Sequence, residues 1–359
     1  MEYPFKVASR YMHRAIELAR LGMSRVAPNP MVGAVVVYHD MIIGEGFHQR
    51  FGEAHAEVNA INAVKDKSLL KDATIYVTLE PCAHYGKTPP CAELIIKSGI
   101  PRVVVGVTDP FAKVKGKGIQ MMKDAGIQVV ESFCEPLCYQ LNRRFFTFHR
   151  HKRPYIILKW AQTLDGFMDI DRTKEYYGQP TWITNELSKV AVHKTRVDED
   201  AIMVGTQTAV KDNPSLTVRE WAQDKHPLRV LLDLNSRVPR TQALFDGAIP
   251  TVIYTYTEES SLPNTTFVSI DKTKGLWQQI LSDLHERNIQ SLIVEGGPTT
   301  LQSLIKESLW DEARVFLGHG FFQSGVRAPE FPGTMVSRDY LDDSSLIVLR
   351  REIDNHENL

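Results

Sequence analysis

One histidine, one glutamate and two cysteines are spaced in a way that suits zinc-dependent hydrolysis. His55 and Glu57 stand in the tripeptide HAE, Cys82 follows Glu57 by 25 residues, and Cys91 comes after eight more intervening residues. One imidazole and two thiolates give zinc three ligands and leave a fourth tetrahedral position for water. Zinc lowers the pKa of bound water from about 15.7 to about 7. Glu57 would then carry the proton from this water to the leaving amine.

The local sequence predicts elements that position these side chains. His55 opens a predicted helix at 55–65, so that Glu57 lies in the same first turn. Cys91 follows two prolines and is the first residue of a predicted helix at 91–98. The amide groups and the dipole at the N-terminus of this helix favour the thiolate form of the cysteine. The pattern matches the described signature of zinc nucleobase deaminases, except that eight residues instead of two separate the cysteines. Isolated buried thiols or a closed structural zinc site are the alternatives, and neither accounts for the adjacent glutamate.

The chain outside these residues predicts two α/β domains. At 359 residues it is too long for one ordinary core, and a basic segment at 142–153 separates two series of alternating elements. We place the domains at 1–147 and 148–359. Short turns between the elements predict largely covered, mostly parallel or mixed sheets. In the first half we expect helices at 5–21 and 118–125 and strands at 32–38, 73–78, 102–107 and 126–131.

Composition limits the class of protein. The formal net charge is −1, with 42 basic and 43 acidic residues, which gives no electrostatic footprint for nucleic acid. The longest apolar runs are strand-sized and too short to cross a membrane. Four cysteines do not make a disulfide framework, and we expect Cys134 and Cys138 to be ordinary reduced thiols. A cytoplasmic enzyme is the expectation.

Longer segments around the zinc constellation resemble one family. PNPMVGAVVV, GEGFH, HAEVNAI and TLEPCAHYGKTPPCAELI are similar to the deaminase half of the bifunctional riboflavin-biosynthesis deaminase–reductase family. The insert between the two cysteines is the most distinctive of these pieces. The resemblance implies a cytidine-deaminase-like α/β/α domain with one zinc ion, acting on a diaminopyrimidine ribosyl phosphate. It also implies substrate contacts at Asn29, His84, Lys87 and Thr88.

In the second half no G-x-G-x-x-G follows a strand, so a Rossmann fingerprint is not supported. The second half contains a different glycine-rich turn. A predicted strand at 291–294 leads into EGGPTT and then into a predicted helix at 301–308. Paired glycines let a ligand approach the backbone, and a helix N-terminus presents free N–H groups to phosphate. A plain strand-to-helix turn is an equally good interpretation of this segment alone.

Taken in order, KWAQTLDG, WIT, DAIMVGTQTAVKDNPSLTVR and VEGG resemble the reductase half of the same family over about 154–315. That half is similar in fold to dihydrofolate reductase, and the resemblance implies hydride transfer from NADPH to C1 of the ribosyl group. Lys159 and Asp165 would support the site. The implied cofactor contacts are Ala161, Trp182, Thr208, Asp212, Ser236, Gly297, Pro298, Thr299 and Thr300. The implied substrate contacts are Arg196, Leu216, Arg219 and Glu295.

The chain departs from the family pattern in three places. Phe111 and Ala112 stand where the family commonly has Asn-Pro, and Pro180 replaces a serine that contacts substrate in some members. The segment 167–181 is several residues longer than usual. We therefore assign no contact to these positions.

The main alternative is a tRNA- or nucleoside-type zinc deaminase with a non-catalytic nucleotide-binding C-terminal domain. It predicts a basic groove and a two-residue spacing between the cysteines, and the sequence has neither. We predict instead a bifunctional enzyme that deaminates and then reduces a small molecule. Nucleic acid and membranes are not expected as partners, and a homo-oligomer (dimer or tetramer) is.

Overall fold

The computed structural model describes residues 3–85, 89–111, 115–179, 181–222, 225–257 and 262–351. The chain divides between Lys152 and Arg153 into two compact units, each with its own buried core. Sequence reasoning places this division at 147/148, which lies inside helix α6 (Arg143–His151). Within the described ranges, no helix is both long enough and apolar enough to span a membrane.

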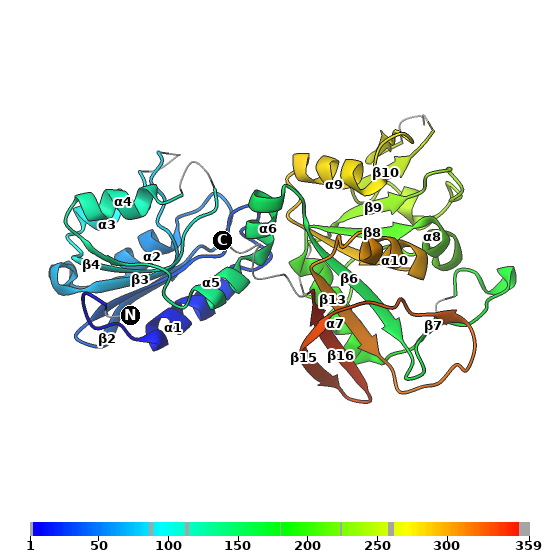
Figure 1. Ribbon diagram of the computed structural model, residues 1–359, viewed down its shortest axis with the longest axis horizontal. Coiled ribbons are helices and arrows are strands. Elements are labelled where there is room, and N and C mark those ends of the chain that lie inside the picture. The colour runs from blue at the N-terminus through cyan, green and yellow to red at the C-terminus, as the bar shows by residue number, and fades with distance from the viewer. Residues whose placement is uncertain are drawn as a thin grey trace. The chain divides into compact units, whose positions relative to one another are not determined.

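The first unit is a five-stranded sheet with helices on both faces (Figure 1). Its strand order is β2-β1-β3-β4-β5; the first three strands pair antiparallel and the last three pair parallel. The strands are β1 (Gly33–Tyr38), β2 (Met41–Phe47), β3 (Thr74–Leu79), β4 (Arg102–Val107) and β5 (Gln128–Val130). Helices α1 (Ser9–Arg20) and α5 (Glu135–Leu141) cover one face; α2 (Ala56–Ala63), α3 (Cys91–Lys97) and α4 (Lys117–Asp124) cover the other.

Strand β2 was not predicted as a strand, because two glycines interrupt its apolar residues and lower its β-propensity. The structure shows what these glycines do. A Cβ atom on Gly44 would lie 2.4 Å from the carbonyl oxygen of Ala60, and one on Gly46 would lie 2.3 Å from the Ala60 nitrogen. Helix α2 therefore packs directly on the backbone of β2. This close approach positions the helix that carries Glu57.

The second unit is built on a nine-stranded sheet of order β11-β10-β9-β8-β12-β6-β13-β16-β15. Seven neighbouring strands run parallel, and the hairpin of β15 and β16 forms an antiparallel edge. The strands are β6 (Tyr155–Gln162), β8 (Ala201–Gly205), β9 (Leu228–Leu232), β10 (Thr251–Thr255), β11 (Thr265–Ser269), β12 (Ser291–Glu295), β13 (Glu312–Leu317), β15 (Thr334–Leu341) and β16 (Ser344–Arg350). The helices are α7 (Glu186–Asp198), α8 (Thr206–Asp212), α9 (Leu276–Glu286) and α10 (Pro298–Lys306).

Two segments contain helices that the sequence does not predict. The connecting segment 142–153 is mostly helix α6, which buries Phe145, Phe146 and Phe148. The largely polar stretch 205–219 begins with helix α8. That helix ends at Asp212, and its C-cap Asn213 adopts a left-handed conformation suited to a helix end. The many charged residues of α6 and the short length of α8, seven residues with only Ala209 buried, weaken the sequence signal for both helices.

Candidate active sites

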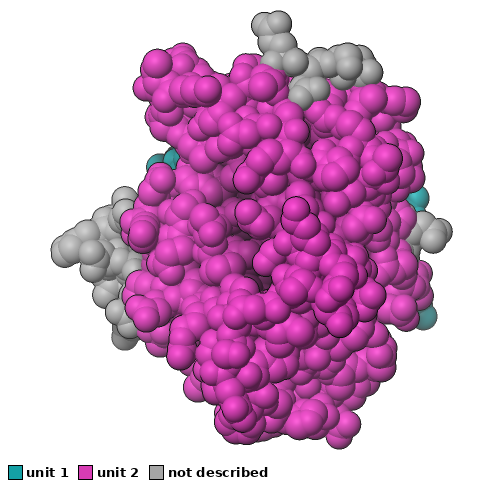
Figure 2. Space-filling view, turned by 90° about the vertical axis from the view of Figure 1, so that its right-hand side faces the viewer, with its two compact units in different colours: residues 1–152 teal, residues 153–359 magenta. Residues whose placement is uncertain are grey.

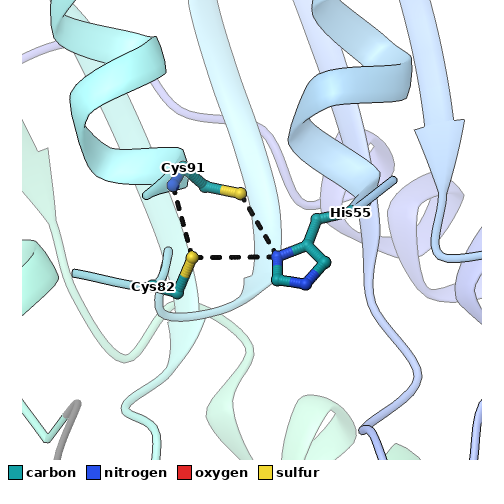
Figure 3. Close-up of side chains that lie close together, drawn as sticks. All are labelled: His55, Cys82 and Cys91. Atoms are coloured by element: carbon teal, nitrogen blue, oxygen red, sulfur yellow. Dashed lines mark hydrogen bonds between the residues drawn. The ribbon is translucent and has the colours of Figure 1, made fainter. Parts of the chain in front are cut away.

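Three side chains of the first unit converge on one point (Figure 3). His55 is the N-cap of α2, Cys91 is the first residue of α3, and Cys82 lies in the loop after β3. The His55 Nδ1 atom lies 3.7 Å from Cys82 Sγ and 3.4 Å from Cys91 Sγ. The backbone N–H of Cys91 donates a hydrogen bond of 3.3 Å to Cys82 Sγ. The ends of two helices and a strand thus bring together residues that are up to 36 positions apart.

This donor set fits one zinc ion. With zinc–sulfur distances of about 2.3 Å and zinc–nitrogen distances of about 2.0–2.1 Å, tetrahedral ligands lie roughly 3.5 Å apart. The two nitrogen–sulfur distances of 3.4 and 3.7 Å bracket this value. The pKa of Cys82 is well below its ordinary value because Cys91 and His55 form hydrogen bonds with its sulfur. A thiolate is the form of cysteine that binds metal.

Glu57 lies in the first turn of α2, beside the three converging side chains, and is only 3% exposed. Burial raises the pKa of Glu57 to about 7, although the neighbouring His55 and a hydrogen bond with Cys91 favour the charged carboxylate. A carboxyl group whose pKa lies near neutrality can both accept and release a proton. A bound dication would lower this pKa and favour the accepting form.

His48 is a functional candidate that sequence reasoning missed. Its Nδ1 lies 3.1 Å from the carbonyl oxygen of Ala54, and its Nε2 lies 3.1 Å from Asn29 Nδ2. A carbonyl oxygen can only accept, so Nδ1 carries the proton and Nε2 accepts from the Asn29 amide. Burial lowers the pKa of His48, which keeps this neutral form. The Asn29 amide nitrogen is thereby fixed as the donor to His48. The ring centroids of His48 and His55 lie 5.4 Å apart.

The loops around this site are held by a second buried carboxylate. Glu80 is 3% exposed and accepts hydrogen bonds from the backbone N–H groups of Asp109, Gly116 and Gly118. This carboxylate fixes the start of α4 next to the Pro-Cys turn. Phe111 packs against His149, with ring centroids 5.2 Å apart.

The remaining predicted residues of the first unit are not all described. His84 is exposed in the loop after Cys82. Lys87 and Thr88 lie outside the described residues, as does Ala112. Their predicted contacts therefore stay predictions.

The second unit, whose surface is shown in Figure 2, contains a cavity of about 710 Å³. It lies where β6, β8 and β12 end, which is where parallel α/β sheets bind ligands. The predicted residues that line it are Ala161, Trp182, Arg196, Thr208, Asp212, Leu216, Arg219, Glu295, Gly297 and Pro298. Three other predicted residues, Ser236, Thr299 and Thr300, do not line it.

An ion cluster whose side chains are only 11–15% exposed lines this cavity. Glu295 at the end of β12 pairs with Arg196 Nη2 at 3.1 Å and with Lys159 Nζ at 3.7 Å. Burial alone would raise the pKa of Glu295, but these two cations lower it to about 2. Burial lowers the pKa of Lys159. An ammonium with a lowered pKa is a better proton donor than an exposed lysine.

His193 is the second residue that sequence reasoning missed. It lines the cavity one helical turn before Arg196 on α7, and its Nδ1 accepts the backbone N–H of Arg219 at 2.9 Å. Burial and the neighbouring Arg196 and Arg219 lower the pKa of His193 to about 4. The ring is therefore neutral at pH 7 and keeps Nε2–H as a donor. The three-residue spacing from Arg196 on a helix was the available sequence signal.

Two further predicted residues of the second unit, Trp182 and Asp165, lie outside the ion cluster. Trp182 is 63% exposed, and the Lys189 ammonium lies 3.8 Å from its ring centroid. Asp165 accepts hydrogen bonds from Thr163 and from the backbone N–H groups of Phe322 and Gln323. Asp165 therefore holds two loops together and is not a lining residue of the cavity.

Comparison with known proteins covers both units. The family described as "Cytidine and deoxycytidylate deaminase zinc-binding region" matches residues 6–107, and the family described as "RibD C-terminal domain" matches residues 154–322. The "Riboflavin biosynthesis protein RibD" of Aquifex aeolicus is 41% identical over 89% of each chain. The protein of that name from Bacillus amyloliquefaciens is 43% identical over 85% of this chain and 83% of its own.

Solved structures give the same result. The diaminohydroxyphosphoribosylaminopyrimidine deaminase/5-amino-6-(5-phosphoribosylamino)uracil reductase of Thermotoga maritima is 37% identical, with a TM-score of 0.85. The match covers 95% of this chain and 97% of that one. Acinetobacter baumannii RibD is 32% identical, with a TM-score of 0.84 over 95% and 98% of the two chains.

Proposed function

Because this chain belongs to the RibD family of bifunctional riboflavin-biosynthesis enzymes, we propose that its two units act in turn on one small molecule. The first unit would deaminate a diaminopyrimidine ribosyl phosphate, and the second would reduce the ribosyl group to ribityl phosphate. The related Thermotoga maritima protein is named for these two activities. The predicted family, the two fold classes and the pairing of a deaminase with a reductase are confirmed. The alternative with a non-catalytic C-terminal domain is not favoured.

In the first unit, His55, Cys82 and Cys91 would hold zinc. Bound zinc supplies Lewis acidity, which brings the pKa of a water molecule toward neutrality. The Glu57 carboxylate would take a proton from the attacking water and deliver it to the departing amino group, which leaves as ammonia. Asn29, oriented by His48, would accept a hydrogen bond from the substrate, and His84, Lys87 and Thr88 would contact its ribosyl phosphate.

The observation that carries this proposal is the convergence of three ligand atoms within 4.8 Å beside a buried carboxyl group. We expect one zinc per chain, and X-ray absorption at the zinc edge should show two sulfur neighbours at about 2.3 Å and one nitrogen at about 2.0–2.1 Å. Cys82→Ser should lower the zinc content, whereas Cys134→Ser, at a thiol outside the cluster, should leave it unchanged. A zinc ion bound by four sulfurs, or undisturbed by Cys82→Ser, would contradict the ligand set.

In the second unit, NADPH would supply a hydride to C1 of the ribosyl group. Gly297, Pro298, Thr299 and Thr300 form the N-terminus of α10, and the first backbone N–H groups of a helix favour phosphate. Here the Gly297 N–H donates to Thr208 Oγ1 and Pro298 has no N–H, so Thr299 and Thr300 would provide these groups. Ala161, Trp182, Thr208, Asp212 and Ser236 would complete the cofactor side. Arg196, Leu216, Arg219 and Glu295 would contact substrate, and planar guanidinium groups suit its phosphate.

Lys159 is the group best placed to supply the proton that this reduction needs. When the hydride adds to C1, the bond from C1 to the ring oxygen breaks and that oxygen needs a proton. Lys159 lines the cavity with only 15% of its side chain exposed, and desolvation lowers its pKa. Glu295 would hold the ammonium in position for this transfer.

We also propose that the chain works in the cytoplasm as a homo-oligomer, without a nucleic-acid partner. The balance of 42 basic and 43 acidic residues supports the last of these points.

A further inference from the structure

The segment after β7 (Phe167–Asp169), which the sequence predicts to be longer than usual for the family, forms part of the cavity wall in the second unit. Asp169 and Arg172 line the cavity, as do Thr181 and Trp182 at the far end of the segment. The backbone N–H of Gly178 donates a hydrogen bond of 2.7 Å to the carbonyl oxygen of Lys211 in α8. We call residues 169–179 the strap.

Arg172 ties the strap to the helix that bears Asp212. Its Nε donates to Asp169 Oδ2 at 2.9 Å, and its Nη1 donates to the Gln179 carbonyl oxygen at 2.8 Å. Its Nη2 contacts both Asp169 Oδ2, at 2.6 Å, and Asp212 Oδ1. The Arg172 side chain is only 5% exposed, so one guanidinium joins both ends of the strap to α8 in a largely dry environment.

The Arg172 guanidinium compensates the negative charge of Asp212. Asp212 is the last residue of α8, where the helix dipole disfavours a carboxylate. Asp169 brings a second carboxylate to the same guanidinium. Without Arg172, two neighbouring carboxylates would repel each other and present uncompensated charge to the cavity. Such charge opposes the binding of a polyanion.

The contact geometry also limits what Arg172 does. Nε, Nη1 and Nη2 each already have a protein acceptor. The guanidinium is therefore occupied in holding carboxylates and backbone, and it is not free to grip a phosphate group as a bidentate ligand. Its contribution to ligand binding would be indirect, through Asp212.

We propose that Arg172 is a positioning residue for the reductase site: it fixes the carboxylate of Asp212 and the strap against α8, so that the cavity accepts a pyridine dinucleotide. This inference rests on the proposed function of the second unit. It assigns a role to the strap, to which the resemblance attaches no contact, and it predicts an effect on cofactor affinity and not on the chemistry of the first unit.

The test is titration of NADPH fluorescence with the full-length chain, together with steady-state kinetics of both reactions. Arg172→Met should raise the Kd and the KM for NADPH by at least about tenfold, because the half-buried carboxylate of Asp212 loses its partner, with a smaller change in kcat. Arg172→Lys should recover part of the affinity. Lys174→Met removes an exposed cation from the same strap and should bind NADPH like the unmodified chain. Ammonia release by the first unit should not change in any of these variants.

The outcomes separate this inference from the function on which it rests. If the unmodified chain binds NADPH and Arg172→Met binds it equally well, the inference is overturned and the proposed function stands. If Arg172→Met loses activity only in proportion to a loss of folded protein, with unchanged affinity in the folded fraction, the inference is also overturned. If the unmodified chain does not bind NADPH, both the proposed cofactor and this inference are wrong.

Discussion

Replacing Glu57 with glutamine is expected to lower the rate of ammonia release by roughly 10²–10⁴-fold, which is the usual contribution of a positioned proton-transfer group. Glutamine has nearly the same shape and still accepts a hydrogen bond, but it cannot take a proton from water. Glu57 is not one of the three proposed zinc ligands, which are His55, Cys82 and Cys91, so the variant should keep its zinc. The measurement is ammonia release with the diaminopyrimidine ribosyl phosphate, alongside the zinc content of the same preparation.

Glu53→Gln provides the matched control, since Glu53 is exposed and lies just before the helix that carries Glu57. It should deaminate at the normal rate. Both variants should also oxidise NADPH normally when given substrate that is already deaminated, which would show that the chain is folded. Full deaminase activity in Glu57→Gln would mean that another group moves the proton.

Replacing Lys159 with methionine is expected to lower the rate of NADPH oxidation by a similar factor while leaving ammonia release intact. Methionine fills a comparable volume but supplies no proton to the opening ribosyl ring and no partner to Glu295. Lys159→Arg separates these two roles, because arginine keeps the charge but does not release a proton near pH 7. We expect both variants to be slow in reduction.

Lys194→Met is the control for this prediction, because Lys194 is an exposed residue of α7 that pairs with Asp198. Its NADPH oxidation should be normal. Normal reduction by Lys159→Arg would show that the positive charge suffices and that the proton comes from elsewhere. Normal reduction by Lys159→Met would remove Lys159 from the mechanism.

The parts of the first site that could be predicted from sequence are those in which residue type and local element act together. His55 and Glu57 lie at the start of one helix, and Cys91 is the first residue of another. Their positions at helix N-termini could therefore be predicted from the local sequence. His48 could not be found in this way. Its role depends on the packing of β2 against α2, and that packing requires Gly44 and Gly46. Because glycine has a low β-propensity, these residues also hide the strand from a sequence-based prediction.

The second site was harder to predict because its contacts join elements that are far apart in the sequence. Its predicted lining residues were recognised by resemblance, but the ion cluster of Lys159, Arg196 and Glu295 forms only when strands β6 and β12 pair beside α7. His193 accepts a hydrogen bond from the backbone N–H of Arg219, 26 residues away. The contacts of Arg172 join Asp169, Gln179 and Asp212, which lie up to 40 residues away along the chain. Long-range packing decides such contacts, and local periodicity carries no information about it.

The central claim is that one chain removes an amino group in one unit and reduces the product in the other. The most direct measurement is a time course with purified full-length protein, zinc, NADPH and the diaminopyrimidine ribosyl phosphate, in which ammonia and oxidised NADPH are quantified in the same samples. We predict that ammonia appears first and that NADPH oxidation approaches one equivalent per ammonia released. Ammonia release without any NADPH oxidation, or oxidation of NADPH before ammonia appears, would contradict the account.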